Sequence, residues 1–280
     1  MPVVQKTGPD GCLYVLDWYD RYHCYQDANR DPAGIDRLKG RLYRVRYQDS
    51  PRAPRFDLAR ESDDQLIERL GSPNVYFRDI AQRVLGERAN AATLPRLEAL
   101  ALDDQAPHKQ RLHALWALLG TGKIEPSTIA KLLAEPDPSL RAWGVRAAGN
   151  LGTADSELRA RLAALAADES PDVRLQLVVA ACKIEGFPSL PVLHQVLASA
   201  GDDVLIPRIV WRNLLPLLDR SGKEFLALVE RGPVTPPVVN LLPRLIDKLL
   251  SAPRLEGEVI ASALGLLAKH SPARAGDAVE

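Results

Sequence analysis

The chain of 280 residues lacks several features that would assign it to a well-defined class of protein. No apolar run approaches the roughly 20 residues that a membrane-spanning helix needs, so no membrane span is expected. Lys+Arg and Asp+Glu number 36 each, and the formal net charge is zero. A general nucleic-acid binder would have an excess of basic residues, so nucleic acid is not an expected partner.

Cysteines and aromatic residues are also scarce. The three cysteines, Cys12, Cys24 and Cys182, form neither a CxxC pair nor a CxxCH haem attachment site. The position of Cys182 on an expected helix face predicts a buried free thiol. A disulfide between Cys12 and Cys24 stays open, because it depends on the redox state of the compartment. Aromatic residues make up 5% of the chain, which suits close helix packing through Leu and Ala.

A recurring arginine is the strongest positive feature. It returns about every 30–36 residues, and apolar or small residues follow it three, six and seven positions later. The five arginines are Arg78, Arg111, Arg141, Arg174 and, more loosely, Arg208. A fixed period of this size is typical of a solenoid built from stacked helical repeats.

Each arginine-bearing helix alternates with a second apolar helix. Examples of its spacing are Leu94/Leu97/Leu100 and Ile129/Leu132/Leu133. Short acidic turns separate the repeats, and Asp or Ser in such turns can cap the helix that follows. We therefore expect a helical array over residues 60–272, with about five to six repeats sharing one continuous core. Residues 273–280 are expected to form a disordered tail.

The first 47 residues are of a different kind. Gly8–Gly11 predicts a turn, residues 12–19 a strand rich in β-formers, and residues 40–47 a second strand with alternating side chains. Residues 48–59 form a proline-broken linker, after which Ser62 and Gln65 predict a capping box. The expected fold is thus mainly α, a HEAT-like α-solenoid preceded by a short two-stranded β segment.

The repeated frame Asp-x-x-Leu/Val-Arg-x-x-Ala-x-x-Ala resembles HEAT repeats of the short bacterial, phycobilisome-lyase-like kind. Residues 137–169 give the cleanest copy, and the resemblance covers roughly residues 60–270. In such repeats the recurring Asp and Arg commonly join neighbouring repeats. The resemblance therefore implies structural roles for Asp172, Arg141 and Arg174.

The segments at residues 8–20 and 40–45 look like the closing blade of a β-propeller. They are similar to the quinoprotein sugar-dehydrogenase-like propellers of planctomycete and verrucomicrobial proteins of the membrane-bound dehydrogenase type. There, HEAT repeats and a c-type cytochrome domain follow the propeller. The resemblance implies a fragment whose flanking domains are its partners, and a periplasmic or cell-envelope location, although residues 1–7 show no signal-peptide pattern.

A loop rich in oxygen ligands is the one candidate metal site. Asp27, Asn29 and Asp31 alternate along the chain, and calcium takes ligands of this type. An EF-hand loop would have glycine and glutamate where this chain has Pro32 and Leu38. The other interpretation is a solvated loop whose Asp and Asn side chains cap their own backbone. Apart from calcium at this candidate site, no cofactor is expected in this chain.

Other residues with chemical potential have a simpler interpretation. His23 lacks a nucleophile at matching spacing, and His108 and His113 lie five residues apart, which does not suit a helical zinc site. Gly120–Lys123 lacks the preceding strand of a phosphate loop and predicts a helix-ending turn. The four tryptophans are expected to be core or inter-repeat anchors, and one or two of them are alternatively candidates for a peptide groove.

Together these features favour a non-catalytic scaffold or protein-interaction region. The alternative is a contribution to a quinone-dependent sugar dehydrogenase of the glucose or sorbosone type. Its candidate residues would be Asp17, Asp20, His23 and Asp27. A further alternative is a chromophore partner like the phycobilisome lyases, which only the repeat resemblance suggests.

Overall fold

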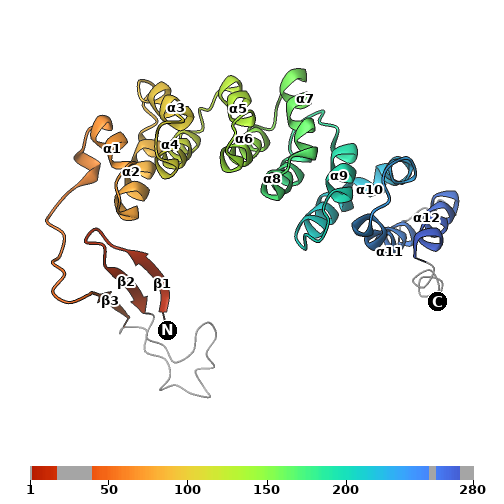
Figure 1. Cartoon of the computed structure of the whole chain (residues 1–280), viewed down its shortest axis with the longest axis horizontal. Coiled ribbons are helices and arrows are strands. Elements are labelled where there is room, and N and C mark those ends of the chain that lie inside the picture. The colour runs from red at the N-terminus through yellow and green to blue at the C-terminus, as the bar shows by residue number, and fades with distance from the viewer. Residues whose placement is uncertain (1, 18–39, 252–256, 272–280) are drawn as a thin grey trace, which may run out of the picture. The chain divides into compact units, whose positions relative to one another are not determined.

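The computed structural model describes residues 2–17, 40–251 and 257–271, and this part of the chain is mainly helical (Figure 1). A short antiparallel sheet precedes the helices α1 to α12. The chain divides into two compact units, Met1–Lys123 and Ile124–Glu280. None of the described helices is both long and apolar enough to cross a membrane.

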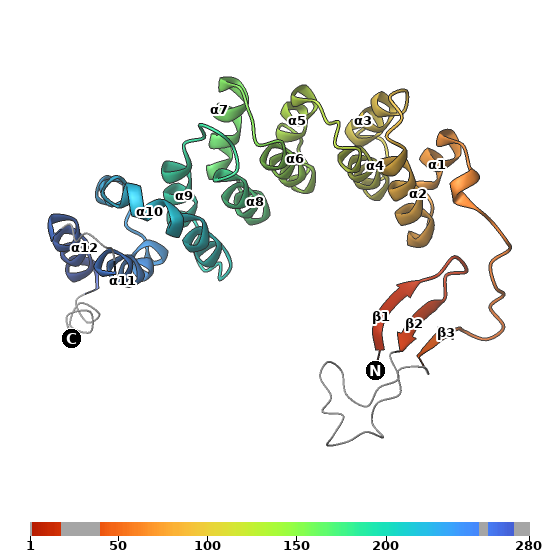
Figure 2. The same ribbon diagram turned by 180° about the vertical axis from the view of Figure 1, so that it is seen from behind.

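The N-terminal sheet has three strands where the sequence predicted two. They are β1 (Pro2–Thr7), β2 (Leu13–Asp17) and β3 (Arg41–Val45), in the order β1-β2-β3 (Figure 2). The missed strand, β1, pairs with β2 across the predicted Gly8–Gly11 turn, where the Gly11 amide donates to the Gly8 carbonyl (3.0 Å). Its residues include Val3, Val4 and Thr7, whose branched side chains favour strands. The two-stranded prediction was therefore wrong.

The first unit continues with five short helical segments. They are the 3-10 turn η2 (Leu58–Arg60) and the helices α1 (Asp63–Arg69), α2 (Val75–Arg88), α3 (Leu94–Leu102) and α4 (His108–Gly120). The predicted capping box is present, with the Ser62 amide donating to Gln65 Oε1 (2.8 Å) and the Gln65 amide to Ser62 Oγ (3.3 Å). Helix α2 packs on α1 and on α4.

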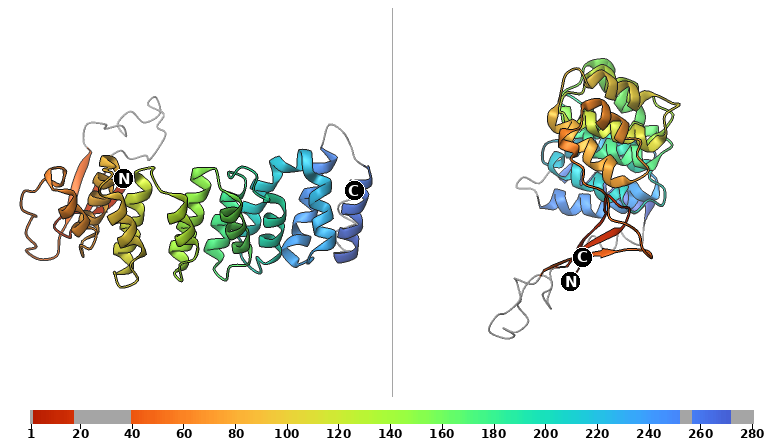
Figure 3. Two further views of the ribbon diagram at one scale, coloured as in Figure 1. Left: turned by 90° about the horizontal axis from the view of Figure 1, so that it is seen from above. Right: turned by 90° about the vertical axis from the view of Figure 1, so that its left-hand side faces the viewer.

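The second unit is built from the helices α5 to α12 and one short 3-10 turn. They are α5 (Pro126–Leu133), α6 (Pro138–Leu151), α7 (Ser156–Ala164), η3 (Leu165–Ala167), α8 (Pro171–Ala181), α9 (Ser189–Ala198), α10 (Ile206–Arg231), α11 (Pro236–Leu250) and α12 (Gly257–His270). Helix α6 packs on α8 and α8 on α10, whereas α5 contacts α7, and α9 contacts α11 (Figure 3). Helix α10 is kinked at Ser221, where φ is −131°.

Leu and Ala form the core, as the spacing after each arginine predicts. All three predicted positions are buried after Arg111, Arg141 and Arg174. After Arg78 only Val84 is half-buried. The weakest repeat follows Arg208, where Leu215 is 38% exposed. Small residues allow the helices to approach closely: a Cβ built on Gly149 of α6 would lie 2.8 Å from Ala180 Cβ of α8.

Candidate functional site

The recurring arginines have structural partners. Arg78 Nη1 donates to the carbonyls of Ser72 (2.6 Å) and Pro73 (3.0 Å), which form the turn before α2. Arg141 and Arg174 repeat this pattern six residues back, on the turns before α6 and α8. Each of these arginines is the fourth residue of its helix. A positive charge there is unfavourable, because the N-terminus is the positive end of the helix dipole. Their contacts with turn carbonyls explain their position there.

Arg141 also joins two repeats. Its Nε and Nη2 donate to Asp168 Oδ2 (2.8 Å) and Oδ1 (2.9 Å), in the turn before α8. Burial alone would raise the pKa of Asp168, but hydrogen bonds from Arg141 and the Ser170 amide outweigh it and hold the pKa below its ordinary value. The carboxylate in this contact is therefore Asp168, whereas Asp172, implicated by the HEAT resemblance, lies exposed in the first turn of α8.

Two other repeat arginines differ from this pattern. Arg111 Nε donates to the Ala101 carbonyl, ten residues back in the last turn of α3 (3.0 Å). Arg208 is exposed near the start of α10 and lines a hollow of about 420 Å³ together with Asp202, Asp203 and Arg244. The repeat frame thus predicted where the arginines lie, but not which of them contact a preceding turn.

Most of the predicted catalytic and metal-binding residues lie outside the described part of the chain. These are the calcium candidates Asp27, Asn29 and Asp31, and the dehydrogenase candidates Asp20 and His23. Asp17 is described and ends β2. No cluster of three or more His, Cys, Asp and Glu side chains suited to a metal ion occurs among residues 2–17, 40–251 and 257–271.

The turn end of the sheet carries a buried polar network. The Asp10 side chain is 2% exposed and accepts hydrogen bonds from Arg44 Nε (2.6 Å), the Tyr14 hydroxyl (3.0 Å) and the Cys12 amide (3.0 Å). Burial would raise the pKa of Asp10, but these hydrogen bonds lower it below its ordinary value. Arg44 Nη2 reaches the carbonyls of Ser50 and Pro51 in the linker. The network therefore fixes the turn to β3 and to the linker.

A second contact joins the sheet to the helices. Asn74 caps α2, with its Oδ1 accepting from the Tyr76 amide (2.9 Å). Its Nδ2 donates to the carbonyls of Gly8 (3.0 Å) and Pro9 (3.2 Å) in the turn between β1 and β2. One side chain thus starts a helix and holds the sheet. Neither Asn74 nor the buried Asp10 was singled out as a functional residue from the sequence.

The rest of the sheet exposes apolar side chains on both faces. Neighbouring residues of a strand point to opposite faces, so the strand register assigns each side chain. Val4, Leu16 and Leu42 lie on one face, and Leu13, Tyr43 and Val45 lie on the other. We call these six residues the apolar sheet surface; their exposed fractions run from 41% to 66%.

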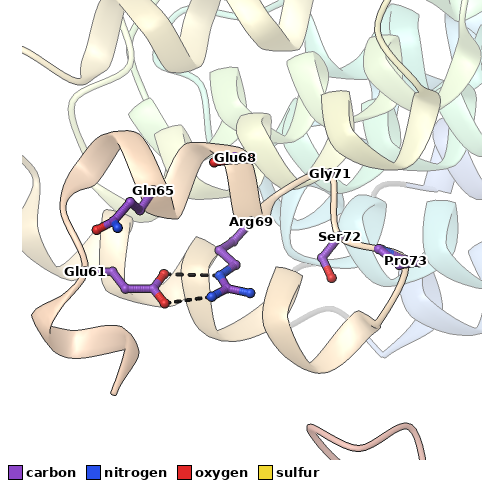
Figure 4. Close-up of a pocket in the computed structure, with 7 residues that line it drawn as sticks. All are labelled: Glu61, Gln65, Glu68, Arg69, Gly71, Ser72 and Pro73. Carbon is purple, nitrogen blue, oxygen red and sulfur yellow. Dashed lines mark hydrogen bonds and ion pairs between the residues drawn. The ribbon is translucent and has the colours of Figure 1, made fainter. Parts of the chain in front are cut away.

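A polar hollow of about 570 Å³ lies beside α1 (Figure 4). Arg69 crosses it to make a bidentate ion pair with Glu61, at 2.9 and 3.2 Å. The Arg69 guanidinium also lies 4.9 Å from the centre of the Phe77 ring. Gln65, Glu68 and Ser72 complete the polar lining. The ion pair fixes Arg69 in place, and the hollow offers carboxylate and hydroxyl oxygens to a polar or cationic group.

The Gly120–Lys123 turn, two of the tryptophans and His113 lie in structural surroundings. Gly120–Lys123 ends α4, with Gly122 at a positive φ of +68°, so the predicted helix-ending turn is confirmed. Trp143 and Trp211 are half-buried, and the Arg146 guanidinium lies 4.7 Å from the centre of the Trp143 ring. His113 Nδ1 is hydrogen-bonded to Gln82 Oε1 (2.8 Å).

The cysteines differ in part from the prediction. Cys182 is exposed at the C-cap of α8, so the prediction of a buried thiol was wrong. Helix α8 ends at Ala181, so Cys182 is the C-cap residue and does not lie on the buried face of the helix. Cys12 is a buried free thiol, and Cys24 lies outside the described residues.

Comparison with known proteins adds no family to this description. No protein-family model matches the chain, and no curated protein matches it either. The assignment of function therefore depends on the geometry and on the sequence resemblances.

Proposed function

We propose that this chain is a non-catalytic scaffold in which a HEAT-like solenoid carries a β-sheet that docks onto another β-sheet domain. The observation that supports this proposal is the apolar sheet surface, which is exposed on both faces. A three-stranded sheet is stable when at least one face is packed, and exposed apolar patches commonly mark interaction sites. Here six large apolar side chains are exposed in three short strands.

The chemistry of the two faces suits a second sheet better than a helix groove or a small ligand. Across the β2–β3 pair, Leu16 lies opposite Leu42, and Leu13 lies opposite Val45. Two sheets pack face to face about 10 Å apart through such rows of aliphatic side chains. A blade of a propeller is covered in this way on both faces. The resemblance of this segment to a closing propeller blade implies the same arrangement.

The contacts at the turn end explain how a helical scaffold would control the sheet. Asn74 holds the turn through two hydrogen bonds, and the Asp10–Arg44 pair ties the turn to β3 and the linker. The apolar sheet surface is thereby presented from a fixed anchor on α2. In this proposal the helices act as a platform, and the repeat arginines keep the turns between helices rigid.

The proposed partner is a propeller like those of the quinoprotein sugar dehydrogenases, with a cytochrome c-like domain after the helices. The compartment proposed with it is the periplasm or cell envelope. Both proposals follow from the resemblance of the first 47 residues. The alternative, in which the chain contributes residues to the dehydrogenase site itself, would need the loop of residues 20–36 to face that site.

The proposal is tested with a variant that makes the surface polar while keeping strand propensity. We suggest Leu42→Thr with Val45→Thr, which changes one exposed residue on each face. The matched control is Val204→Thr with Leu205→Thr, at exposed positions (70% and 52%) before α10. Each is expressed in the cells that make the protein naturally, and the native size of the chain is measured in extracts by size-exclusion chromatography.

We expect the wild type and the Val204/Leu205 control to migrate in a complex larger than one chain, and the sheet variant to shift to the size of a single chain. Circular dichroism should show that both variants keep their helices. If the sheet variant stays in the complex while the control leaves it, the helices rather than the sheet are the docking surface. If the wild type is a single chain, the scaffold proposal is wrong.

A further inference from the structure

We propose a second binding site in the second unit, a cavity beside His194 that takes an aromatic ring bearing a hydroxyl group. The cavity has a volume of about 440 Å³ and lies between α9 and the C-terminal end of α10. Small-molecule pockets typically have volumes of about 300–1,000 Å³. The site is independent of the apolar sheet surface, which belongs to the first unit.

The decisive observation is an unpartnered polar atom. His194 belongs to α9 and is 6% exposed. Its Nε2 is buried and has no hydrogen-bond partner among the residues that the structure describes. The ring is held edge-on against Phe225, with 6.2 Å between ring centres, and it packs against the backbone of Gly232. A buried polar atom of this kind is costly unless something else supplies the hydrogen bond.

The cavity wall around this nitrogen is mainly apolar. Pro191 and Ala198 contribute from α9, and Leu228 and Pro233 from the end of α10 and the residues after it. The polar side chains of Gln195, Ser199 and Arg231 also line the cavity. Such a wall suits a flat apolar ring, because the favourable free energy comes from removing apolar surface from water. A ring alone would leave the histidine nitrogen unpaired. The ligand therefore needs one polar group on an otherwise apolar body.

A hydroxyl group fits this position best. Burial lowers the pKa of His194, so the imidazole is neutral at neutral pH and one ring nitrogen carries the proton. A hydroxyl both donates and accepts, so it pairs with Nε2 in either tautomer. A carboxylate would pair only with the tautomer that carries the proton on Nε2, because it accepts hydrogen bonds and does not donate them. The phenolic group has two sources, a free small phenol or a tyrosine side chain of a bound protein.

The test compares p-cresol with toluene, which has the same methyl-substituted ring without the hydroxyl. Binding to the full chain is measured by saturation-transfer NMR and by titration of the His194 ring signals. We expect p-cresol to bind about tenfold more tightly than toluene, since one neutral hydrogen bond contributes about this factor. In His194→Phe, which keeps a flat ring beside Phe225, the preference should fall to about one.

A second variant guards against a folding defect. Ala198→Leu fills the cavity from a half-exposed wall position and leaves His194 unchanged, so it should abolish the binding of both compounds. Unchanged thermal melting by circular dichroism shows that each variant is folded. A titration with N-acetyl-tyrosinamide distinguishes the two sources: comparable binding indicates a tyrosine side chain, and its absence indicates a free phenol.

The proposal is overturned by any of three results. Equal affinity of the wild type for p-cresol and toluene would mean that water satisfies His194. Retention of the preference in His194→Phe would place the hydroxyl elsewhere. Failure of p-cresol to bind at about 10 mM, a concentration that detects even very weak complexes, would show that the cavity is not a site for this chemistry.

Discussion

Replacing Arg141 with methionine tests the role of the recurring arginines most sharply. Arg141→Met keeps an unbranched apolar side chain and removes only the guanidinium. That group makes a bidentate ion pair with Asp168 and hydrogen bonds to the carbonyls of Glu135 (2.9 Å) and Pro136 (2.8 Å). The variant therefore breaks the link between the turns that precede α6 and α8.

The magnitude follows from the burial of the two partners. The Asp168 side chain is 6% exposed and the Arg141 side chain is 17% exposed. Removing one partner of a fully buried ion pair costs about 3–5 kcal/mol, because the other charge is left without compensation. Partial access of water to the arginine side lowers this figure. We expect a loss of about 2–4 kcal/mol in the free energy of opening α6 and α8.

The assay is hydrogen exchange followed by mass spectrometry on the full chain. A loss of about 2–4 kcal/mol corresponds to exchange about 30-fold to 700-fold faster in the amides of α6 and α8. The matched control is Arg161→Met, which removes an exposed ion pair with Glu157 on α7. Such surface pairs contribute about 0.5 kcal/mol or less. Its effect on exchange should therefore be no more than about twofold.

If Arg141→Met and Arg161→Met changed exchange by similar small factors, the Arg141–Asp168 pair would stabilise α6 and α8 no more than an exposed ion pair does. A double-mutant cycle with Asp168→Asn separates the ion pair from the carbonyl contacts. A coupling energy near zero would show that the pair contributes nothing beyond its separate hydrogen bonds.

Three further predictions concern the contact between the sheet and α2, the packing of α6 on α8, and the charge of Asp168. Asn74→Asp keeps the helix cap but removes the amide that holds the sheet, so exchange in β1 and β2 should rise about fivefold to tenfold while α2 stays protected. Gly149→Val should lower the free energy of unfolding by about 2–3 kcal/mol in urea, because its Cβ would meet α8, whereas Gly265→Ala in open space should be neutral or stabilising. The folded pKa of Asp168 lies below its unfolded value of about 3.9, so its stabilising effect is complete above that value and is lost as the pH falls through the folded pKa. The stability difference between wild type and Arg141→Met should thus be constant from about pH 5 to 7 and shrink below about pH 4.

The sequence predicted the helices well because their signals are local and repeated. The Ser62–Gln65 box, the acidic turns and the apolar positions after each arginine depend on spacing within one or two turns of helix. The late helices α11 and α12 also fall within the helical array expected over residues 60–272. The arrangement of repeats between the two units remains a prediction.

The errors came from contacts that are distant in the sequence. Strand β1 was missed because its pairing with β2 is set by the register across the turn, and its own pattern does not alternate cleanly. Cys182 was predicted to be buried because the apolar spacing of the helix was continued beyond Ala181, where α8 ends. The HEAT resemblance implicated Asp172 together with Arg141 and Arg174, whereas the carboxylate that Arg141 contacts is Asp168, four residues earlier in the turn.

The candidate site was the least predictable part. Asp10 and Arg44 lie 34 residues apart, and Asn74 lies 66 residues from Gly8, so only the folded chain brings these groups together. The alternation in residues 40–47 did predict that Leu42 and Val45 are strand residues. The alternation did not predict that their side chains are exposed, because an apolar strand position is ordinarily buried. The polar atom of His194 gave no signal either, since a single histidine on an apolar helix usually finds a partner in the core.

Photo-crosslinking at the sheet tests directly whether its two faces dock onto another β-sheet domain. A photoreactive phenylalanine analogue is placed at Leu42 or at Tyr43, which are exposed by 66% and 45% and point to opposite faces. Irradiation is carried out in the cells that make the protein naturally, and the adducts are mapped by mass spectrometry. We expect adducts from both positions, with β-sheet residues of one partner domain. Adducts from neither position, together with adducts from Val204 in the turn before α10, would show that the sheet is not the docking surface.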